Sequence, residues 1–401
     1  MKAAPSNGTL PALLFPAFTA LTIACAAFSA QAADFTLNYL GQQIVPTGTL
    51  FAGTTIGGLS GLDYDADTQR FFAISDDRSQ FNPARVYTLH LDLNRFVRSA
   101  TPGMAGVAFI NAITIAQPGG GAFGLNTVDP EGIRYSGGKL YWSNEGQRSG
   151  AGFQNPTVRE MNLNGSPSRD FAVPAYYNPV GSNGGLVDGA DAGIYNNLAF
   201  ESLTVSTDGR ILYTATENAL AQDSLPATVA NGSRSRILSF DIATGTAGAE
   251  YAYDVSPVVL APNPAGGFAT NGLTDLLAIG DREFIAIERS FAVGAVTPGT
   301  PVTGNTIRLY HVDVTTATNI AGIADLTGQT VTTATKSLLL DLSTLRNDDG
   351  SALALDNIEG LTFGPSVNGK RTLILVSDNN FASTQFTQFV ALEVAPVPKP
   401  E

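Results

Sequence analysis

A pattern of two short strands recurs five times along the chain, and this repetition limits the folds that the sequence can adopt. Each copy has an apolar strand that begins among small and acidic residues, a short turn, and a second apolar strand that ends in Asp, Glu or Asn. A short, turn-rich connection predicts an antiparallel hairpin. The first strands read GLSGLDYD (58–65), DPEGIRYS (129–136), FESLTVST (200–207), NGLTDLLAI (271–279) and NIEGLTFG (357–364).

The copies are regularly spaced. Aligned at Gly61, Gly132, Ser202, Gly272 and Gly360, they are 71, 70, 70 and 88 residues apart. A long, regular period is typical of repeat folds. A third strand follows every hairpin, and a fourth apolar stretch follows the first four copies. Four strands per copy, repeated radially, predict an all-β fold, a β-propeller of four-stranded blades.

The N-terminal strand expected at Phe35–Val45 has no copy of its own, and the fifth copy stops after its third strand. We infer that this strand completes the last blade and closes the ring, which removes two free sheet edges. Five blades are visible. A sixth blade within the longer fourth interval is the alternative, with Gly294–Asn305 and Thr315–Thr335 otherwise interpreted as insertions. One propeller domain is expected over 33–395, followed by a disordered Pro-rich tail at 396–401.

Residues 1–32 match a secretory signal peptide. Lys2 is their only charged residue, an uncharged apolar run follows, and Ala30-Gln31-Ala32 fits the small-x-small cleavage pattern. We expect a secreted or periplasmic mature protein that begins near Ala33. A retained transmembrane anchor and a lipoprotein modified at Cys25 are the alternatives. Cys25 is the only cysteine, so the mature chain would have neither disulfides nor thiol chemistry.

The formal net charge of −13 argues against a nucleic-acid partner, because binding to a phosphate backbone needs a basic face. An acidic chain is better suited to binding cations. We also expect a monomer that has no contact with a membrane after the signal peptide is cleaved.

Both ends of every hairpin carry acidic or polar side chains. The first strand of a propeller blade lines the central channel, and a hairpin brings the start of its first strand beside the end of its second. The two sets of residues should therefore meet at one mouth of the channel. The first set is Ser60, Glu131, Glu201, Asn271 and Glu359, and the second is Asp76-Asp77, Asn144-Glu145, Glu217-Asn218, Glu288-Arg289 and Asp378-Asn379.

Carboxylates crowded at one opening repel each other and raise each other's pKa values unless a cation neutralises them. Calcium binds carboxylate, amide and carbonyl oxygens together, so Ca²⁺ is the expected cofactor. The structural alternative is that these acids only form turns or tie neighbouring blades together. The expected metal ligands are Asp76, Glu131, Glu201, Glu217, Glu359 and Asp378.

Arginines stand among the acids. Arg78, Arg148 and Arg289 follow second strands and are the candidates to bind an anionic substrate. Glu145 or Glu288 is the candidate to orient or deprotonate an attacking water. The two histidines of the mature chain lie in third strands, away from the channel, which disfavours a Ser-His-Asp triad.

These motifs resemble the phytase-like family that has esterase-like activity. The resemblance covers about Leu50 to Val394 and rests on GLSGLDYD with FFAISDDR, DPEGI with LYWSNEG, ESLTV with LYTATEN, and NIEGLTFG with LILVSDNNF. It implies an exported propeller, distantly related to calcium-dependent phytases that cleave phosphate monoesters with metal-bound water. This chain lacks the dense Lys and Arg array expected for a highly phosphorylated inositol, which disfavours phytate itself.

The leading hypothesis is an exported calcium-dependent hydrolase that acts on a small anionic substrate, a phosphate or related ester. One alternative is a non-catalytic, calcium-stabilised binding propeller at the cell surface, favoured by the lack of a clear nucleophile. The other is a lactonase-type propeller hydrolase, which also uses a channel-mouth metal with Glu and Asn ligands.

Overall fold

The structure is a computed structural model that describes Met1, residues 35–181 and residues 191–396. The predicted signal peptide, apart from Met1, and the predicted tail, apart from Pro396, lie outside the described residues. Within the described part, the only helices are the short 3₁₀ turns η1 (Leu93–Arg95), η2 (Ala175–Tyr177) and η3 (Leu342–Thr344). No helix in this part is long and apolar enough to cross a membrane.

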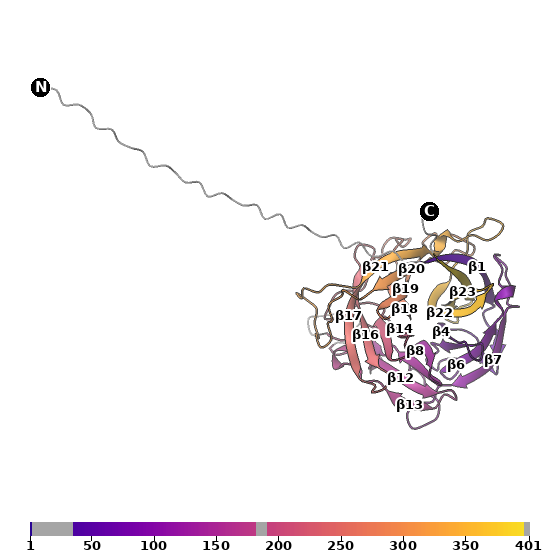
Figure 1. Ribbon diagram of the computed structural model, residues 1–401, viewed down its shortest axis with the longest axis horizontal. Helices are drawn as coiled ribbons and strands as arrows, with labels where there is room; N and C mark the ends of the chain where they lie inside the picture. Colours follow the sequence, from indigo (N-terminus) through magenta and orange to yellow (C-terminus); the bar gives the residue numbers. More distant parts are fainter. Residues whose placement is uncertain (2–34, 182–190, 397–401) are drawn as a thin grey trace. The chain divides into compact units, whose positions relative to one another are not determined.

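Five four-stranded antiparallel sheets are arranged as the blades of a propeller (Figure 1). Blade 1 comprises β4 (Leu59–Asp65), β5 (Arg70–Ser75), β6 (Arg85–Leu91) and β7 (Val107–Thr114). Blade 2 comprises β8 (Pro130–Ser136), β9 (Lys139–Asn144), β12 (Thr157–Asn162) and β13 (Pro167–Asp170). Blade 3 comprises β14 (Phe200–Val205), β15 (Ile211–Thr216), β16 (Ser233–Asp241) and β17 (Ala247–Val255).

Blade 4 comprises β18 (Ala269–Ala278), β19 (Glu283–Ala292), β20 (Asn305–Asp313) and β21 (Thr335–Asp341). Blade 5 comprises β22 (Asn357–Val367), β23 (Lys370–Asp378), β24 (Thr387–Pro396) and β1 (Phe35–Val45). Two small hairpins occur in connections: β2 (Leu50–Phe51) with β3 (Thr54–Thr55) between β1 and β4, and β10 (Gln147–Ser149) with β11 (Gly152–Gln154) between β9 and β12 of blade 2.

The prediction of five blades is confirmed, and the alternative of six is wrong. The two segments in which a sixth blade was considered are the connections from β19 to β20 and from β20 to β21, both inside blade 4. Closure by the N-terminal strand is also confirmed. Strand β1 pairs antiparallel with β24, from Phe35 opposite Pro396 to Val45 opposite Thr387. In Figure 1 the indigo β1 lies beside the yellow strands of the last blade.

The apolar core consists of layers between neighbouring blades. Successive residues of a strand face opposite sides of a sheet, so each blade contributes to two layers. On β5, Ile74 packs in a cluster with Trp142 of blade 2, whereas Ala73 packs in a cluster with Val376 and Phe389 of blade 5. Similar clusters join the other neighbouring blades. The fold is therefore held by packing around a closed ring.

Small residues recur in the first strands because these strands approach each other closely around the channel. A Cβ atom on Gly132 would lie 2.8 Å from the backbone nitrogen of Leu203 and 2.9 Å from the carbonyl oxygen of Glu201 in the next blade. Gly61 and Gly360 meet backbone atoms of their neighbouring blades at similar distances. A larger side chain would push the first strands apart, so glycine is required at these positions.

A buried ion pair that was not predicted from the sequence connects the first strands of all five blades. Arg134 of blade 2 binds Asp275 of blade 4 at 3.0 Å, with both side chains 2% exposed. The guanidinium also donates to the carbonyl oxygen of Leu62 in blade 1 at 2.8 Å. The carboxylate accepts from the backbone N–H groups of Leu361 in blade 5 at 2.9 Å and of Leu203 in blade 3 at 3.4 Å. The Arg134–Asp275 pair is thus a buried polar contact shared by the first strands of all five blades.

Candidate functional site

Every first strand contains a β-bulge at the channel mouth. The pairing register skips between Leu59 and Gly61, and it skips at the matching place in each of the other four blades. A bulge leaves one extra residue outside the ladder and redirects its side chain. In blades 2, 3 and 5 that residue is a glutamate that lines a cavity at the mouth. The residues at the five bulges are Ser60, Glu131, Glu201, Thr274 and Glu359.

The same register locates the ends of the second strands. The residue opposite the first strand just before each bulge is Ser75, Asn144, Thr216, Glu288 or Ser377. The next residue along each second strand faces the other side of its sheet. These next residues are Asp76, Glu145, Glu217, Arg289 and Asp378. The mouth therefore receives an acid from every second strand except that of blade 4, which contributes an arginine.

The structure does not bring Glu288 to the mouth, contrary to our expectation. Glu288 is 2% exposed and accepts hydrogen bonds from the hydroxyl of Tyr253 at 2.7 Å and from the amide of Asn271 at 3.2 Å. Its carboxylate also pairs with the ammonium of Lys336. Strand alternation explains this placement, because Glu288 precedes the mouth position by one residue. Asn271 likewise lies outside the mouth, and Thr274 occupies the bulge in blade 4.

Arg148 also lies away from the mouth. Its guanidinium is 1% exposed and donates to the carbonyl oxygens of Val180 and Ala192, the latter at 2.6 Å. It lies 3.7 Å from the carboxylate of Asp191 and packs over the ring of Phe153. Arg148 therefore fastens the β10–β11 hairpin to the segments near 180 and 192, and it is not available to bind a substrate.

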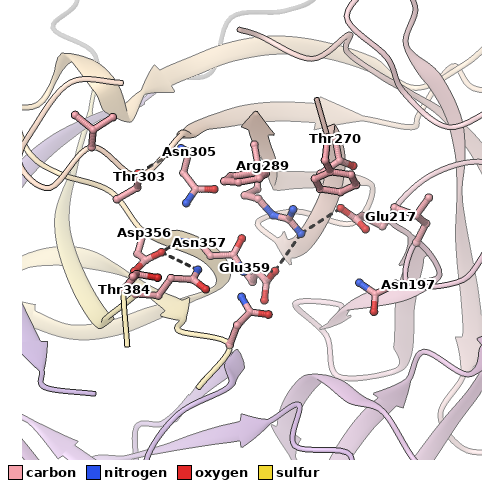
Figure 2. A pocket seen from close by; sticks show the side chains of 16 residues that line it. Asn197, Glu217, Thr270, Arg289, Thr303, Asn305, Asp356, Asn357, Glu359 and Thr384 are labelled. Atoms are coloured by element: carbon pink, nitrogen blue, oxygen red, sulfur yellow. Dashed lines mark hydrogen bonds and ion pairs between the residues drawn. The ribbon is translucent and has the colours of Figure 1, made fainter. Parts of the chain in front are cut away.

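Eight of the other nine candidate residues line two neighbouring cavities at the mouth, and the ninth, Glu145, lies 3.7 Å from Arg78. The first, here called the acidic cavity, has a volume of about 300 Å³, and its walls include Arg78, Arg289 and six carboxylates. The second, here called the side cavity, has a volume of about 580 Å³, and its walls include Glu217, Phe268, Phe291 and Asn305 (Figure 2). Arg289 and Glu359 belong to both cavities. The six carboxylates of the acidic cavity are Asp76, Asp77, Glu131, Glu201, Glu359 and Asp378.

Two arginines stand among these acids. Arg289 lies between Glu217 at 3.3 Å and Glu359 at 3.1 Å (Figure 2). Arg78 donates to Asp129 at 2.8 Å and to the amide oxygen of Asn197 at 2.6 Å. Burial alone would lower the pKa of each guanidinium, but the neighbouring carboxylates raise it above its ordinary value. Both side chains are therefore firmly cationic.

Asp129, Glu131 and Glu145 form a compact carboxylate triad in blade 2. One oxygen from each lies within 4.8 Å of the others, and all three residues are buried. The backbone fixes this group: Glu145 accepts from the N–H of Ala199 at 2.8 Å, and the N–H of Glu145 donates to the carbonyl of Asp129 at 2.9 Å. Asp129 is not among the metal ligands predicted from the sequence, although its position two residues before Glu131 in DPEGI was a usable signal.

The sequence that forms this site matches a known protein family. The model of a family described as phytase-like, with the esterase-like activity of phytase, matches residues 54–381. The chain belongs to this phytase-like family. The match runs from β3 to the turn after β23, so it includes every residue of the carboxylate triad and of the acidic cavity.

Other comparisons add nothing to the function of this phytase-like protein. A search of curated proteins finds no match. Matching solved structures include the Dos1 propeller, with 8% identity, a TM-score of 0.34, and coverage of 84% of this chain and 68% of that one. An exo-1,5-α-L-arabinanase from a bovine ruminal metagenomic library has 8% identity, a TM-score of 0.37, and coverages of 86% and 95%. The Bacillus subtilis arabinanase Arb43A has 13% identity, a TM-score of 0.36, and coverages of 84% and 94%. At such TM-scores these similarities carry no argument.

The acids at the mouth of the phytase-like propeller have strongly raised pKa values. Burial, reinforced by neighbouring carboxylates, raises the pKa values of Asp129, Glu131, Glu201 and Asp378 well above their ordinary range. Burial likewise raises the pKa of Asp76 to about 7. Such a cluster is costly unless positive charge compensates it.

A divalent cation fits this arrangement. The triad offers three carboxylate oxygens within reach of one ion. Nearby, the buried Oδ1 of Asp76 has no hydrogen-bond donor among the described residues. A donor set made only of oxygen atoms suits a hard cation such as Ca²⁺ better than zinc or copper. The buried acidic group therefore has the composition of a metal site.

Without metal, the stability of the protein should fall as the pH rises from 5 to 8. Burial raises the pKa values of Asp76 and Glu217 from 3.8 and 4.5 to about 7. Acids with a raised folded-state pKa stabilise the fold below their unfolded pKa and lose that stability as the pH rises through the folded value. Thermal melting in EDTA should show this decrease. A metal-free Tm that rises over this pH range would contradict the prediction.

Proposed function

We propose that this phytase-like protein is an exported, calcium-dependent hydrolase of phosphate or related esters. One observation carries the proposal: a buried carboxylate triad lies beside two firmly cationic arginines at the mouth of a propeller channel. The triad can hold a cation, and the arginines can hold an anion next to it. Family membership supports the same class of reaction, since the family is described by an esterase-like activity.

The residues divide into three roles. Asp129, Glu131 and Glu145 would hold the calcium ion, supported by the acids of the acidic cavity other than Glu201. When bound, calcium supplies Lewis acidity and lowers the pKa of coordinated water. Glu145 is 1% exposed and accepts from the N–H of Ala199. These contacts favour Glu145 as a metal ligand over our first assignment of it as the base.

Arg78 and Arg289 would bind the anionic group of the substrate. Arg78 retains 28% of its side-chain exposure, so a ligand can reach it from the solvent. Arg289 lines both cavities and would hold the ester where they meet. Guanidinium groups suit this task because they bind phosphate through two parallel hydrogen bonds.

Glu201 is the acid best suited to accept a proton from the attacking water. It lies on a bulge of β14 and lines the acidic cavity. Burial and the neighbouring carboxylates Glu145 and Glu217 raise its pKa above the ordinary value for a glutamate. A carboxylate with a raised pKa holds a proton more readily than an ordinary glutamate, as proton transfer from water requires.

A substrate panel tests this function. Purified mature protein should hydrolyse a phosphate monoester or diester in the presence of calcium, and EDTA should abolish the reaction until calcium is restored. The panel should also contain carboxylic esters and lactones, because the lactonase-type alternative predicts turnover of lactones in preference to phosphate esters. If no ester is hydrolysed by a protein whose Tm rises with calcium, the hydrolase proposal is wrong and the non-catalytic binding propeller replaces it.

Calcium should stabilise the protein whether or not it is an enzyme. At about a thousand times its Kd, a bound ion contributes about 4 kcal/mol to the free energy of unfolding. For a chain of this size, that corresponds to an increase of about 5 °C in Tm. Differential scanning calorimetry at pH 8, with calcium or EDTA, measures this increase. An unchanged Tm at millimolar calcium would argue against a calcium site at the mouth.

Export rests on residues 1–32, which the structure does not test. N-terminal sequencing of the protein from the culture medium or the periplasm should show a chain that begins near Ala33. Recovery of a chain that retains residues 1–32 in the membrane fraction would favour the anchored alternative.

A further inference from the structure

The side cavity is larger than the anionic group of an ester requires. Its volume of about 580 Å³ falls in the range of small-molecule pockets, whereas the acidic cavity next to it measures about 300 Å³. The two cavities meet at Arg289 and Glu359. A substrate held by Arg289 would therefore extend the rest of its structure into the side cavity.

The charge of the side cavity excludes a second anionic group on that part of the substrate. Among the described residues, Arg289 is the only cation in the lining, and Glu217 and Glu359 already pair with it. Asp356 adds a further carboxylate to the wall (Figure 2). A phosphate placed deep in this cavity would face acids without a free cation, so the group bound there should be neutral.

One wall of the side cavity is aromatic. Phe268 and Phe291 have ring centroids 6.1 Å apart and planes inclined at 41°. Phe268 is 68% exposed, although its carbonyl oxygen is held by the N–H of Val293 at 3.0 Å. An exposed ring on a fixed backbone offers a flat apolar surface on which a second ring can stack.

Beside Phe291, its cross-strand partner Asn305 offers the side cavity an unused hydrogen-bond acceptor. Asn305 is 4% exposed, and its Oδ1 has no donor among the described residues. Its side chain projects into the cavity from the start of β20 (Figure 2). A buried amide oxygen without a partner is costly, and a ligand with a hydroxyl or N–H group would relieve this cost.

From these features we infer that the side cavity binds the leaving alcohol of the substrate, and that this alcohol carries a neutral aromatic ring with a hydrogen-bond donor at its edge. The inference rests on the proposed ester hydrolase function and specifies its substrate class. The ester group lies against Arg289, the ring stacks on Phe268 and Phe291, and the donor meets Asn305. A polyphosphorylated substrate does not fit, because it would place phosphate groups against the carboxylates of the side cavity.

Binding of phosphonates, which contain no cleavable ester bond, tests the inference without requiring turnover. Isothermal titration calorimetry on the calcium-loaded protein should show that phenylphosphonate binds about tenfold more tightly than methylphosphonate. Phe268→Ala and Phe291→Ala should each remove most of this preference and leave methylphosphonate binding unchanged. Leu225→Ala is the matched control, because Leu225 is 69% exposed and lies outside both cavities. It should preserve the preference.

A second set of binding measurements tests the role of Asn305. A 3-hydroxyphenylphosphonate should bind more tightly than phenylphosphonate, and Asn305→Leu should remove this gain without reducing the binding of phenylphosphonate. Equal affinities for methyl- and phenylphosphonate, or a preference that survives both phenylalanine substitutions, would overturn the inference. Tighter binding of inositol hexakisphosphate than of phenylphosphonate would overturn it as well. If the aromatic preference is present but no ester is hydrolysed, the hydrolase function fails and the ring-binding cavity stands.

Discussion

Glu131→Gln protein, supplied with calcium, will hydrolyse phosphate esters at least about 100-fold more slowly than the wild-type protein. Glu131 belongs to the carboxylate triad and also lines the acidic cavity, so it connects the expected metal position with the substrate. Glutamine keeps the size of the side chain but removes its charge. The loss should appear in kcat/KM, and the calcium concentration at half-maximal activity should rise.

A stability measurement separates this loss of function from misfolding. Burial and the nearby carboxylates raise the pKa of Glu131 well above its ordinary value, so an ionised Glu131 destabilises the metal-free fold at pH 8. The glutamine variant should therefore melt in EDTA at the wild-type temperature or above it, and its Tm should increase less when calcium is added. Glu283→Gln is a suitable control, because the side chain of Glu283 is 48% exposed and lies outside both cavities. Wild-type activity and calcium dependence in Glu131→Gln would refute its assignment as a ligand.

Arg134→Met protein will be less stable than the wild-type protein by about 3–5 kcal/mol at pH 8. The substitution leaves Asp275 buried without its cation and removes the donors to carbonyl groups of blades 1, 4 and 5. Urea unfolding monitored by tryptophan fluorescence would measure the loss, since Trp142 lies buried at the interface of blades 1 and 2. Arg98→Met is the control. Arg98 pairs with Asp348 with half of its side chain exposed, and its loss should cost less than about 1 kcal/mol.

The loss in Arg134→Met should depend on pH. In the wild-type protein, burial raises the pKa of Asp275 to about 6 even though Arg134 opposes this shift. Removing Arg134 raises the pKa further, so in the variant Asp275 takes up a proton at a higher pH. The free-energy loss should therefore be smaller at pH 5 than at pH 8, and Asp275→Asn in the Arg134→Met background should restore part of the stability at pH 8. A loss that is equal at both pH values would show that the uncompensated charge is not its cause.

The sequence pattern of a single hairpin was sufficient to predict which residues lie at the same edge of that hairpin. Alternating apolar residues and turns place the first and second strands of each copy, and hairpin geometry then brings Glu359 and Asp378 to the same sheet edge. The structure places both in the acidic cavity, together with Asp76, Glu131 and Glu201. Their service as metal ligands remains a proposal.

In the fourth copy, aligning the sequence motifs places the bulge at the wrong residue. In the sequence, Gly272 of the NGL motif aligns with Gly61 and Gly360. In the structure, the bulge of this strand is at Thr274, so the residue after the bulge, Asp275, is the equivalent of Gly61 and Gly360. The strand pairing then brings Arg289 to the mouth and turns Glu288 toward Lys336. A shift of one residue exchanges the two faces of a strand, and only the observed register determines which face a side chain occupies.

The sequence by itself determined the propeller fold, the closing strand and the acidic character of the mouth, because these follow from periodicity and from contacts between neighbours in the chain; the structure was needed to choose five blades over six. The tertiary structure alone decided which acids share a site with Arg289 and that Arg134 meets Asp275, 141 residues away in sequence. Closing the ring brings the first strands of all five blades against one channel. The neighbours of a side chain in the channel belong to other blades, and they depend on strand register and on ring closure. The sequence of a single repeat therefore cannot predict them.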